Sequence, residues 1–194
     1  SVEMAVPGER VDRRGSVAVD GSAPPRRRRL WVSRSPGRVV VRGRTIERRP
    51  GDDFDAASSK FIQLAQAFPQ DKYTWRPMEG VRSVSEVLML AATEGYGFIP
   101  GLFGAKAGTP GSPQDLAKVT DKEQVLDHLN KAFAYAKQQV QAIDPSTLTG
   151  KRKMMGRDMS IIDGMLFLGG DFHEHLGQLI AYARMNKIVP PWSK

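Results

Sequence analysis

The chain has 194 residues, of which 40% are hydrophobic and none is cysteine. That length and composition predict a soluble domain with a core of its own. The absence of cysteine excludes disulfides, thiolate metal sites and cysteine nucleophiles, and it agrees with the cytoplasmic location that we predict. The apolar stretch 161–185 is interrupted by charged and histidine side chains, so we expect no membrane span.

The net charge of +8 resides in the first 50 residues. They hold 13 arginines, no lysine and 5 acidic residues, whereas residues 51–194 hold 16 basic and 16 acidic residues. Glycine, proline and serine are scattered through the leader, and its one short apolar patch cannot offset the entropy cost of ordering. We predict a disordered arginine-rich extension over 1–50 with no role in the fold; a nucleic-acid-binding arm is the weaker alternative.

Four amphipathic helices are predicted in the remainder of the chain. Their apolar residues recur at intervals of three or four over 52–68, 84–98, 120–143 and 160–185. The second and third begin at capping-box patterns, Ser83 to Glu86 and Thr120 to Glu123. No strand pattern separates the helices, which predicts an all-α fold, an antiparallel four-helix bundle.

The connections between these helices are predicted as irregular. Residues 100–120 are rich in Gly, Pro, Ser and Thr, and 151–159 form a basic, methionine-rich connector. The tail 188–192 contains two prolines and cannot be helical. We expect it to lie back on the bundle, anchored by Trp192.

Metal-ligand residue types recur at helical spacing at one place, in the fourth helix. Asp171 and His175 are four residues apart, so their side chains project from the same side of the helix. They lie at the edge of the apolar stripe, where bundles build sites from facing helices. The structural alternative is a core-edge histidine that hydrogen-bonds Asp171 or a backbone carbonyl.

The neighbouring polar residues are predicted to have structural roles. His173 is two residues from each candidate ligand, so it points elsewhere, and with Glu174 it is assigned to a solvated face. His128 in the third helix is expected at the surface. Gln178 and Tyr182 continue the line of Asp171 and His175 and would close the site with hydrogen bonds or serve as bundle contacts.

Several segments of the body resemble the damage-inducible, DinB-like family of four-helix bundles. The resemblance covers roughly 52–194 and is carried by Trp75-Arg76-Pro77, by 80–87 at the start of the second helix, by 173–184 and by 188–192. In that family three histidines bind a divalent metal of the zinc or nickel type. One histidine lies in the second helix, and two lie four residues apart in the fourth.

Carried over to this chain, the family ligands fall on Leu90, Asp171 and His175. Asp171 replaces a histidine with another ligand, but Leu90 cannot coordinate a metal, so the site between the second and fourth helices is depleted. Glu94 and Glu86 each lie one turn from Leu90, and either would supply a third ligand. A first-row metal site needs about three protein ligands.

Two functions follow from the resemblance. The first is a metal-dependent hydrolase or thiol transferase that acts on a small molecule. The alternative is a non-catalytic bundle, ligand-binding or homodimeric, that has lost the metal. Nucleophile-elbow and phosphate-loop patterns are absent from the sequence.

Overall fold

The structure, a computed structural model, describes residues 10–11, 17–18, 38–41, 44–47, 51–154 and 156–193. The chain divides into two compact units, Ser1–Arg34 with Arg38–Ile46, and Ser35–Gly37 with Glu47–Lys194. Near the N-terminus, β1 (Arg10–Val11) pairs antiparallel with β2 (Val17–Ala18), and β3 (Arg38–Val41) pairs with β4 (Arg44–Glu47). These short strands were not expected. The rest of the predicted disordered extension lies outside the described residues.

The second unit is mostly helical, as predicted. Its principal helices are α1 (Asp52–Ala67), α2 (Val84–Thr93), the π-helical segment η2 (Glu94–Phe98), α3 (Ile99–Leu102), α5 (Lys122–Gln141) and α6 (Ile161–Met185). Short turns η1 (Gln70–Lys72), α4 (Pro113–Leu116), η3 (Pro145–Thr147) and η4 (Pro191–Ser193) connect or end them. Each predicted helix is present, with ends shifted by a few residues.

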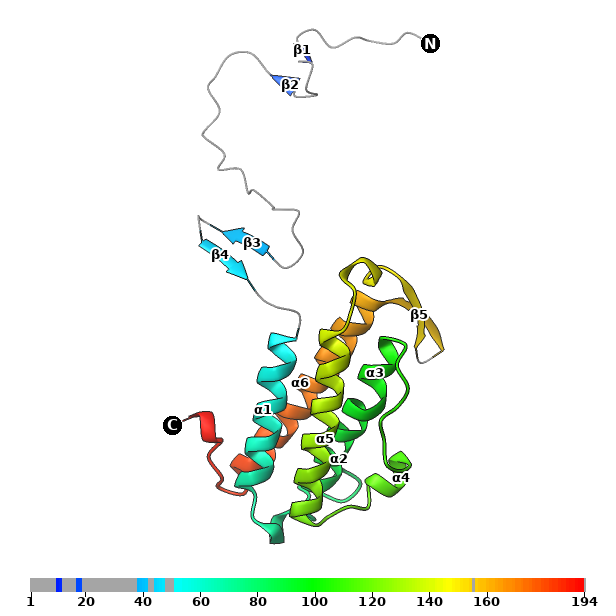
Figure 1. Cartoon of the computed structure of the whole chain (residues 1–194). Helices are drawn as coiled ribbons and strands as arrows, with labels where there is room; N and C mark the ends of the chain where they lie inside the picture. The colour runs from blue at the N-terminus through cyan, green and yellow to red at the C-terminus, as the bar shows by residue number, and fades with distance from the viewer. Residues whose placement is uncertain are drawn as a thin grey trace, which may run out of the picture. The chain divides into compact units, whose positions relative to one another are not determined.

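The long helices pack in a ring, in which α1 and α2 each contact both α5 and α6. In Figure 1, α1 and α6 run in one direction, and α2 and α5 run in the other. The neighbours α2 and α5 are therefore parallel, so the bundle departs from the simple antiparallel order that we expected. The physical reason is the long connection 103–121, which returns along the bundle, whereas short loops force neighbours to be antiparallel.

Helices α2 and α6 are antiparallel, and this sets the register of the site between them. At one end the hydroxyl of Tyr182 donates to the backbone carbonyl of Arg82, at 3.0 Å. At the other end Leu102 of α3 lies directly over Gly164 of α6, where a Cβ would collide with it. The middle of α6 therefore faces the end of α2.

Aromatic rings fill the centre of the bundle. Phe172 of α6 contacts Phe54, Phe61 and Phe133, with ring centroids 5.5, 4.6 and 5.6 Å away. Phe61 is fully buried, and Phe133 and Phe172 are nearly so. This cluster ties α1, α5 and α6 together and fixes the rotation of α6 about its axis.

The predicted cap of the second helix is confirmed, and that of the third is displaced. The Ser83 hydroxyl accepts from the Glu86 amide, and the Glu86 carboxylate accepts from the Ser83 amide. At the third helix the cap is Asp121, not Thr120, because the Asp121 carboxylate accepts from the amide of Gln124. Aspartate is a stronger cap than threonine, which accounts for the shift of one residue.

The basic, methionine-rich connector 151–159 contains two strands, although no strand pattern was expected between the helices. Strands β5 (Lys151–Met154) and β6 (Arg157–Ser160) form an antiparallel hairpin, with Lys151 paired with Ser160. Gly156 adopts a φ of 77° at the turn, a conformation that glycine reaches without strain. Met154 is buried in the smaller of two core clusters, so one apolar side chain anchors a basic hairpin.

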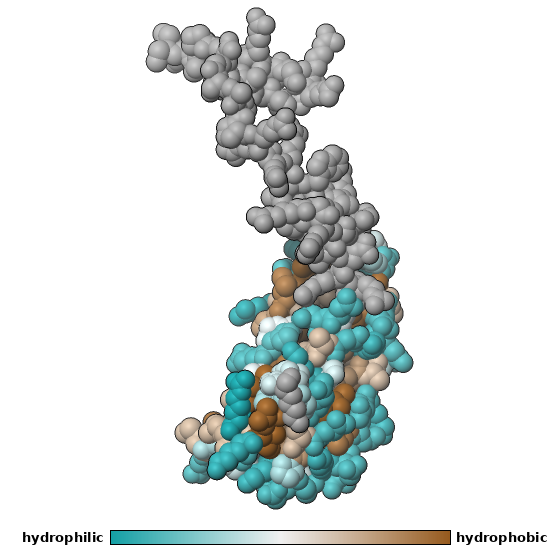
Figure 2. Space-filling view, turned by 90° about the vertical axis from the view of Figure 1, so that its left-hand side faces the viewer, coloured by the Kyte–Doolittle hydropathy of each residue, from teal (hydrophilic) through white to brown (hydrophobic). Residues whose placement is uncertain are grey.

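The C-terminal tail packs as expected, with Trp192 against the main core and Lys60 of α1 over its ring. The face that carries α1 and this tail is largely hydrophilic, with apolar side chains in separate patches (Figure 2). Among the described residues, no helix is both long enough and apolar enough to span a bilayer.

Candidate metal centre

The end of α2 changes from an α-helix to a π-helix at Glu94. The amide of Ile99 donates to the carbonyl of Glu94, five residues earlier, which widens the turn. π-helical turns occur frequently at functional sites. Gly95 allows this turn to approach α5 closely, because a Cβ at this position would lie 3.1 Å from the backbone of Ala132 in α5. The turn therefore packs directly against α5.

Glu94, Asp171 and His175 converge in the space between η2 and α6. One ligand atom from each lies within 4.8 Å of the other two. The Nε2 atom of His175 is 3.5 Å from a Glu94 carboxylate oxygen and 3.8 Å from an Asp171 carboxylate oxygen. The side chains of His175 and Glu94 are 12% and 4% exposed, and that of Asp171 is 37% exposed. The group is thus buried on the α2 side and open to solvent at Asp171.

Burial perturbs the acidity of Glu94. Loss of water around the carboxylate, followed by the charge and a hydrogen bond of Asp171, raises the pKa of Glu94 to about 8, while Arg82 opposes the shift. Without a cation, Glu94 therefore keeps its proton at neutral pH, because two carboxylates this close cannot both ionise without a compensating charge.

The His175 ring makes no ordinary hydrogen bond with the described residues. Its buried Nδ1 atom has no partner, and both Nε2 distances exceed the usual range of about 2.7–3.2 Å. A buried polar group without a partner is costly. The structural alternative, a histidine hydrogen-bonded to Asp171 or to a backbone carbonyl, is therefore not found among the described residues.

The other candidates for a third ligand lie elsewhere. Glu86 is occupied by the cap with Ser83 and by an ion pair with Arg76 at 3.2 Å. Leu90 is half-buried and lines a separate pocket of about 350 Å³ with Arg82 and Thr93, among others. Of the two glutamates considered, Glu94 is the one that reaches the imidazole.

The remaining predicted residues divide between surface and structural roles. His173 is exposed, as predicted, but it also bonds Asp53 of α1. His128, which we expected at the surface, is half-buried beside Tyr96, with Nδ1 3.3 Å from the hydroxyl. Gln178 donates to the hydroxyl of Tyr182, a bundle contact that stabilises the end of α6 against the start of α2.

Comparison with known proteins agrees with this architecture. A sequence model of the DinB superfamily matches residues 53–179. A DinB-like protein from Bacillus cereus ATCC 10987 has a similar structure, with a TM-score of 0.62 and 16% identity over 71% of this chain and 91% of the other.

A second solved structure, a conserved protein from Enterococcus faecalis, gives a TM-score of 0.57 and 18% identity over 70% of this chain and 93% of the other. No match was found among curated proteins. At these identities the solved structures establish the fold alone. Because the family match spans more than half of the sequence, the chain belongs to the DinB superfamily.

Proposed function

We propose that Glu94, Asp171 and His175 bind one divalent metal ion of the zinc or nickel type, and that the protein is a metal-dependent hydrolase or thiol transferase. The observation that carries this proposal is their convergence, with ligand atoms within 4.8 Å of one another. The glutamate takes the role that the family pattern gives to the residue at position 90.

The donor set suits such an ion. Tetrahedral ligands that are each 2.1 Å from an ion lie about 3.4 Å apart, close to the separations of 3.5 and 3.8 Å between His175 Nε2 and the carboxylate oxygens. Two carboxylates also balance the charge of a divalent cation. Coordination at Nε2 would give that nitrogen a partner in place of the hydrogen bond it does not make to either carboxylate.

When bound, the ion supplies Lewis acidity and lowers the pKa of a coordinated water or thiol. The chain's own residues provide the setting for that chemistry. Glu94 and His175 form the buried side of the group, and Asp171 lies on the side open to solvent. Glu94 would hold the ion as a carboxylate, and its raised pKa makes loss of its proton a cost of metal binding below about pH 8.

The separate pocket along α2 comes close to this group, although none of the three ligands lines it. Its volume is about 350 Å³, and Leu90, Thr93 and Arg82 contribute to its wall. Thr93 directly precedes Glu94, and Arg82 is close enough to lower the pKa of that glutamate. We propose that a small substrate with an acidic group binds here, with the Arg82 guanidinium as its partner.

Metal stoichiometry tests the proposal through a matched pair of histidine variants. Protein prepared without a histidine tag is dialysed against zinc and analysed by atomic emission. We expect one ion per chain in wild type and in His173→Gln, and none in His175→Gln or Asp171→Ala. Absence of bound metal from the wild type, or equal binding by both histidine variants, would end the proposal.

The second candidate is a non-catalytic bundle that binds a ligand or forms a homodimer. Leu90 favours it, because a non-coordinating side chain occupies the position of the family histidine. The variant Leu90→His separates the two candidates. Tight zinc binding by Leu90→His with none by the parent would favour the second candidate, a bundle that has lost its metal. Tight binding by both proteins would favour the three-residue site.

A further inference from the structure

A second cavity lies between α6 and the start of α1. Its volume is about 140 Å³, and its walls come from α1, α3, α5 and α6. Apart from Asp53 and His173, every described residue that lines it is apolar or glycine. None of the three proposed metal ligands lines this cavity, so an inference about it does not depend on the proposed function.

This cavity and the metal group lie on opposite faces of α6. Gly169 and His173 line the cavity, while Asp171 and His175 approach Glu94 across the helix. Residues two apart on a helix point about 200° away from each other. The same two turns of α6 therefore serve two different sites.

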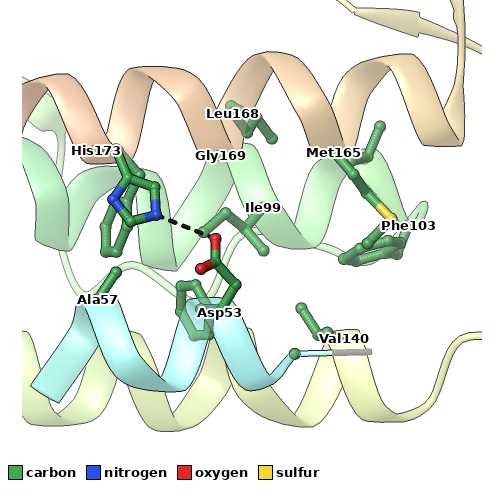
Figure 3. A pocket seen from close by; sticks show the side chains of 13 residues that line it. Asp53, Ala57, Ile99, Phe103, Val140, Met165, Leu168, Gly169 and His173 are labelled. Atoms are coloured by element: carbon green, nitrogen blue, oxygen red, sulfur yellow. Dashed lines mark hydrogen bonds and ion pairs between the residues drawn. The ribbon is translucent and has the colours of Figure 1, made fainter. Parts of the chain in front are cut away.

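The polar groups of the cavity stand at its edge. His173 Nε2 lies 3.0 Å from an Asp53 carboxylate oxygen, and the two side chains are 49% and 66% exposed. Figure 3 shows them meeting across the gap between α6 and α1, with Met165 and Phe103 farther along the cavity. The cavity is therefore apolar inside and polar on its solvent side.

We propose that this cavity binds a small aromatic compound that carries one hydrogen-bond donor, such as a phenol or an aromatic amine. The size supports a single ring, since an apolar cavity of about 150 Å³ in another protein holds benzene. Three phenylalanine rings, those of Phe54, Phe103 and Phe172, offer the flat and edge contacts that aromatic rings prefer.

The polar edge of the cavity favours a ligand that carries a hydrogen-bond donor over a ligand that carries a negative charge. An ionised carboxylate is an acceptor only, so Asp53 accepts a hydroxyl or amine hydrogen and repels a carboxylate. Two further acidic side chains, Asp52 and Asp55, lie in the first turn of α1, but neither lines the cavity, and Asp55 pairs with Lys137 of α5 at 2.7 Å. Among the residues that the structure describes, His173 is the one basic side chain that lines the cavity.

Phenol is the probe for the test, and two adjacent glycines of α6 provide matched variants. A Cβ added at Gly169 or at Gly170 meets no atom within 4 Å, so both positions accept leucine without a backbone clash. Gly169 lines the cavity and Gly170 does not. Both substitutions strengthen the helix to a similar degree, so their stabilities can be compared directly.

We expect saturable binding of phenol, measured by ligand-observed NMR, in wild type and in Gly170→Leu. In Gly169→Leu the leucine fills the cavity, and the affinity should fall by about tenfold or more. Unfolding curves of the two variants verify that both are folded. Equal affinity of the two variants, or no saturable binding by the wild type, would overturn the proposal.

Toluene, which has no donor, tests the role of the edge. In Asp53→Ala the affinity for phenol should fall by about tenfold, the effect of one hydrogen bond to a charged acceptor. The affinity for toluene should stay the same. Equal losses for both compounds, or no loss for either, would contradict the role given to Asp53.

Discussion

Two histidines of α6, two residues apart, form acid–imidazole pairs in contrasting surroundings. His175 meets Glu94 on the side of α2, where both side chains are almost fully buried. His173 meets Asp53 on the side of α1, where both are open to water. Both pairs join an imidazole to a carboxylate, yet the buried pair has the longer separation, 3.5 Å against 3.0 Å.

The comparison indicates that solvent exposure, more than residue type, determines whether an acid–imidazole pair needs a further partner. Water screens the exposed pair, which is worth less than about 1 kcal/mol and requires no further partner. In the buried group, Glu94 has lost most of its contact with water. It instead faces a second carboxylate, that of Asp171, and the His175 ring, which makes no hydrogen bond to the described residues. That arrangement favours a cation, and the raised pKa of Glu94 has the same origin.

The largest expected effect is on metal affinity. Glu94→Gln removes an anionic ligand from a set of three, and we expect the zinc affinity, measured by isothermal titration calorimetry, to fall by about 100-fold or more. Asp53→Asn makes the corresponding change in the exposed pair and should leave the affinity unchanged. Similar losses in both variants would remove the distinction between the two pairs.

The pH dependence of stability should also differ between the pairs. Folding raises the pKa of Glu94 from 4.5 to about 8, so the folded chain holds this proton more tightly than the unfolded chain does. The resulting stabilisation is fully present below pH 4.5 and is lost as the pH rises through about 8.

Urea unfolding with EDTA at pH 5.5 and pH 8.5 measures this loss. The metal-free wild type should lose up to a few kcal/mol between the two values, since one pKa unit corresponds to about 1.4 kcal/mol. Glu94→Gln should lose less. Zinc binding should show the reverse trend and strengthen with pH, because coordination requires the deprotonated carboxylate. Identical pH profiles for wild type and variant would contradict the perturbed glutamate.

A smaller effect is expected from the π-helical turn that positions Glu94. Gly95→Ala places a Cβ 3.1 Å from the backbone of Ala132, so we expect a loss of about 1–3 kcal/mol together with weaker metal binding. Gly97→Ala is the control, because its Cβ meets no atom within 4 Å and should stabilise the segment by about 0.5–1 kcal/mol. Chemical denaturation of both variants makes the comparison.

The smallest effect belongs to the exposed pair itself. Removal of His173 by His173→Ala should change the free energy of unfolding by less than about 1 kcal/mol, and high salt should reduce the change further. A loss of several kcal/mol would mean that this pair is structural, contrary to its exposure.

Much of the fold could be predicted from local sequence. Apolar periodicity located the long helices, and the Ser83 cap marked the start of α2 to the residue. The hairpin at 151–160 was missed because its strands are mostly exposed and basic, so alternation with apolar residues does not appear. The direction of α5 depends on the path of a long loop, which local patterns do not specify.

The candidate site could be predicted only in part. The spacing of Asp171 and His175 reveals a shared helix face, but Glu94 was no more than one of two options. On a regular helix Glu86 and Glu94 each lie about 40° from the direction of position 90, so spacing alone does not choose between them. The π turn that begins at Glu94 depends on the close approach of Gly95 to α5. The two glycines around this turn were the available signal. The pairing of His173 with Asp53 joins distant segments and had no local signature.

The central claim is that three side chains on η2 and α6 form one metal site. The most direct test is a crystal structure of the zinc-loaded protein with an anomalous difference map recorded at the zinc edge. We predict one strong peak about 2.0–2.2 Å from His175 Nε2 and from a carboxylate oxygen of both Glu94 and Asp171. No peak at this group, or a single peak between Asp53 and His173, would contradict the account.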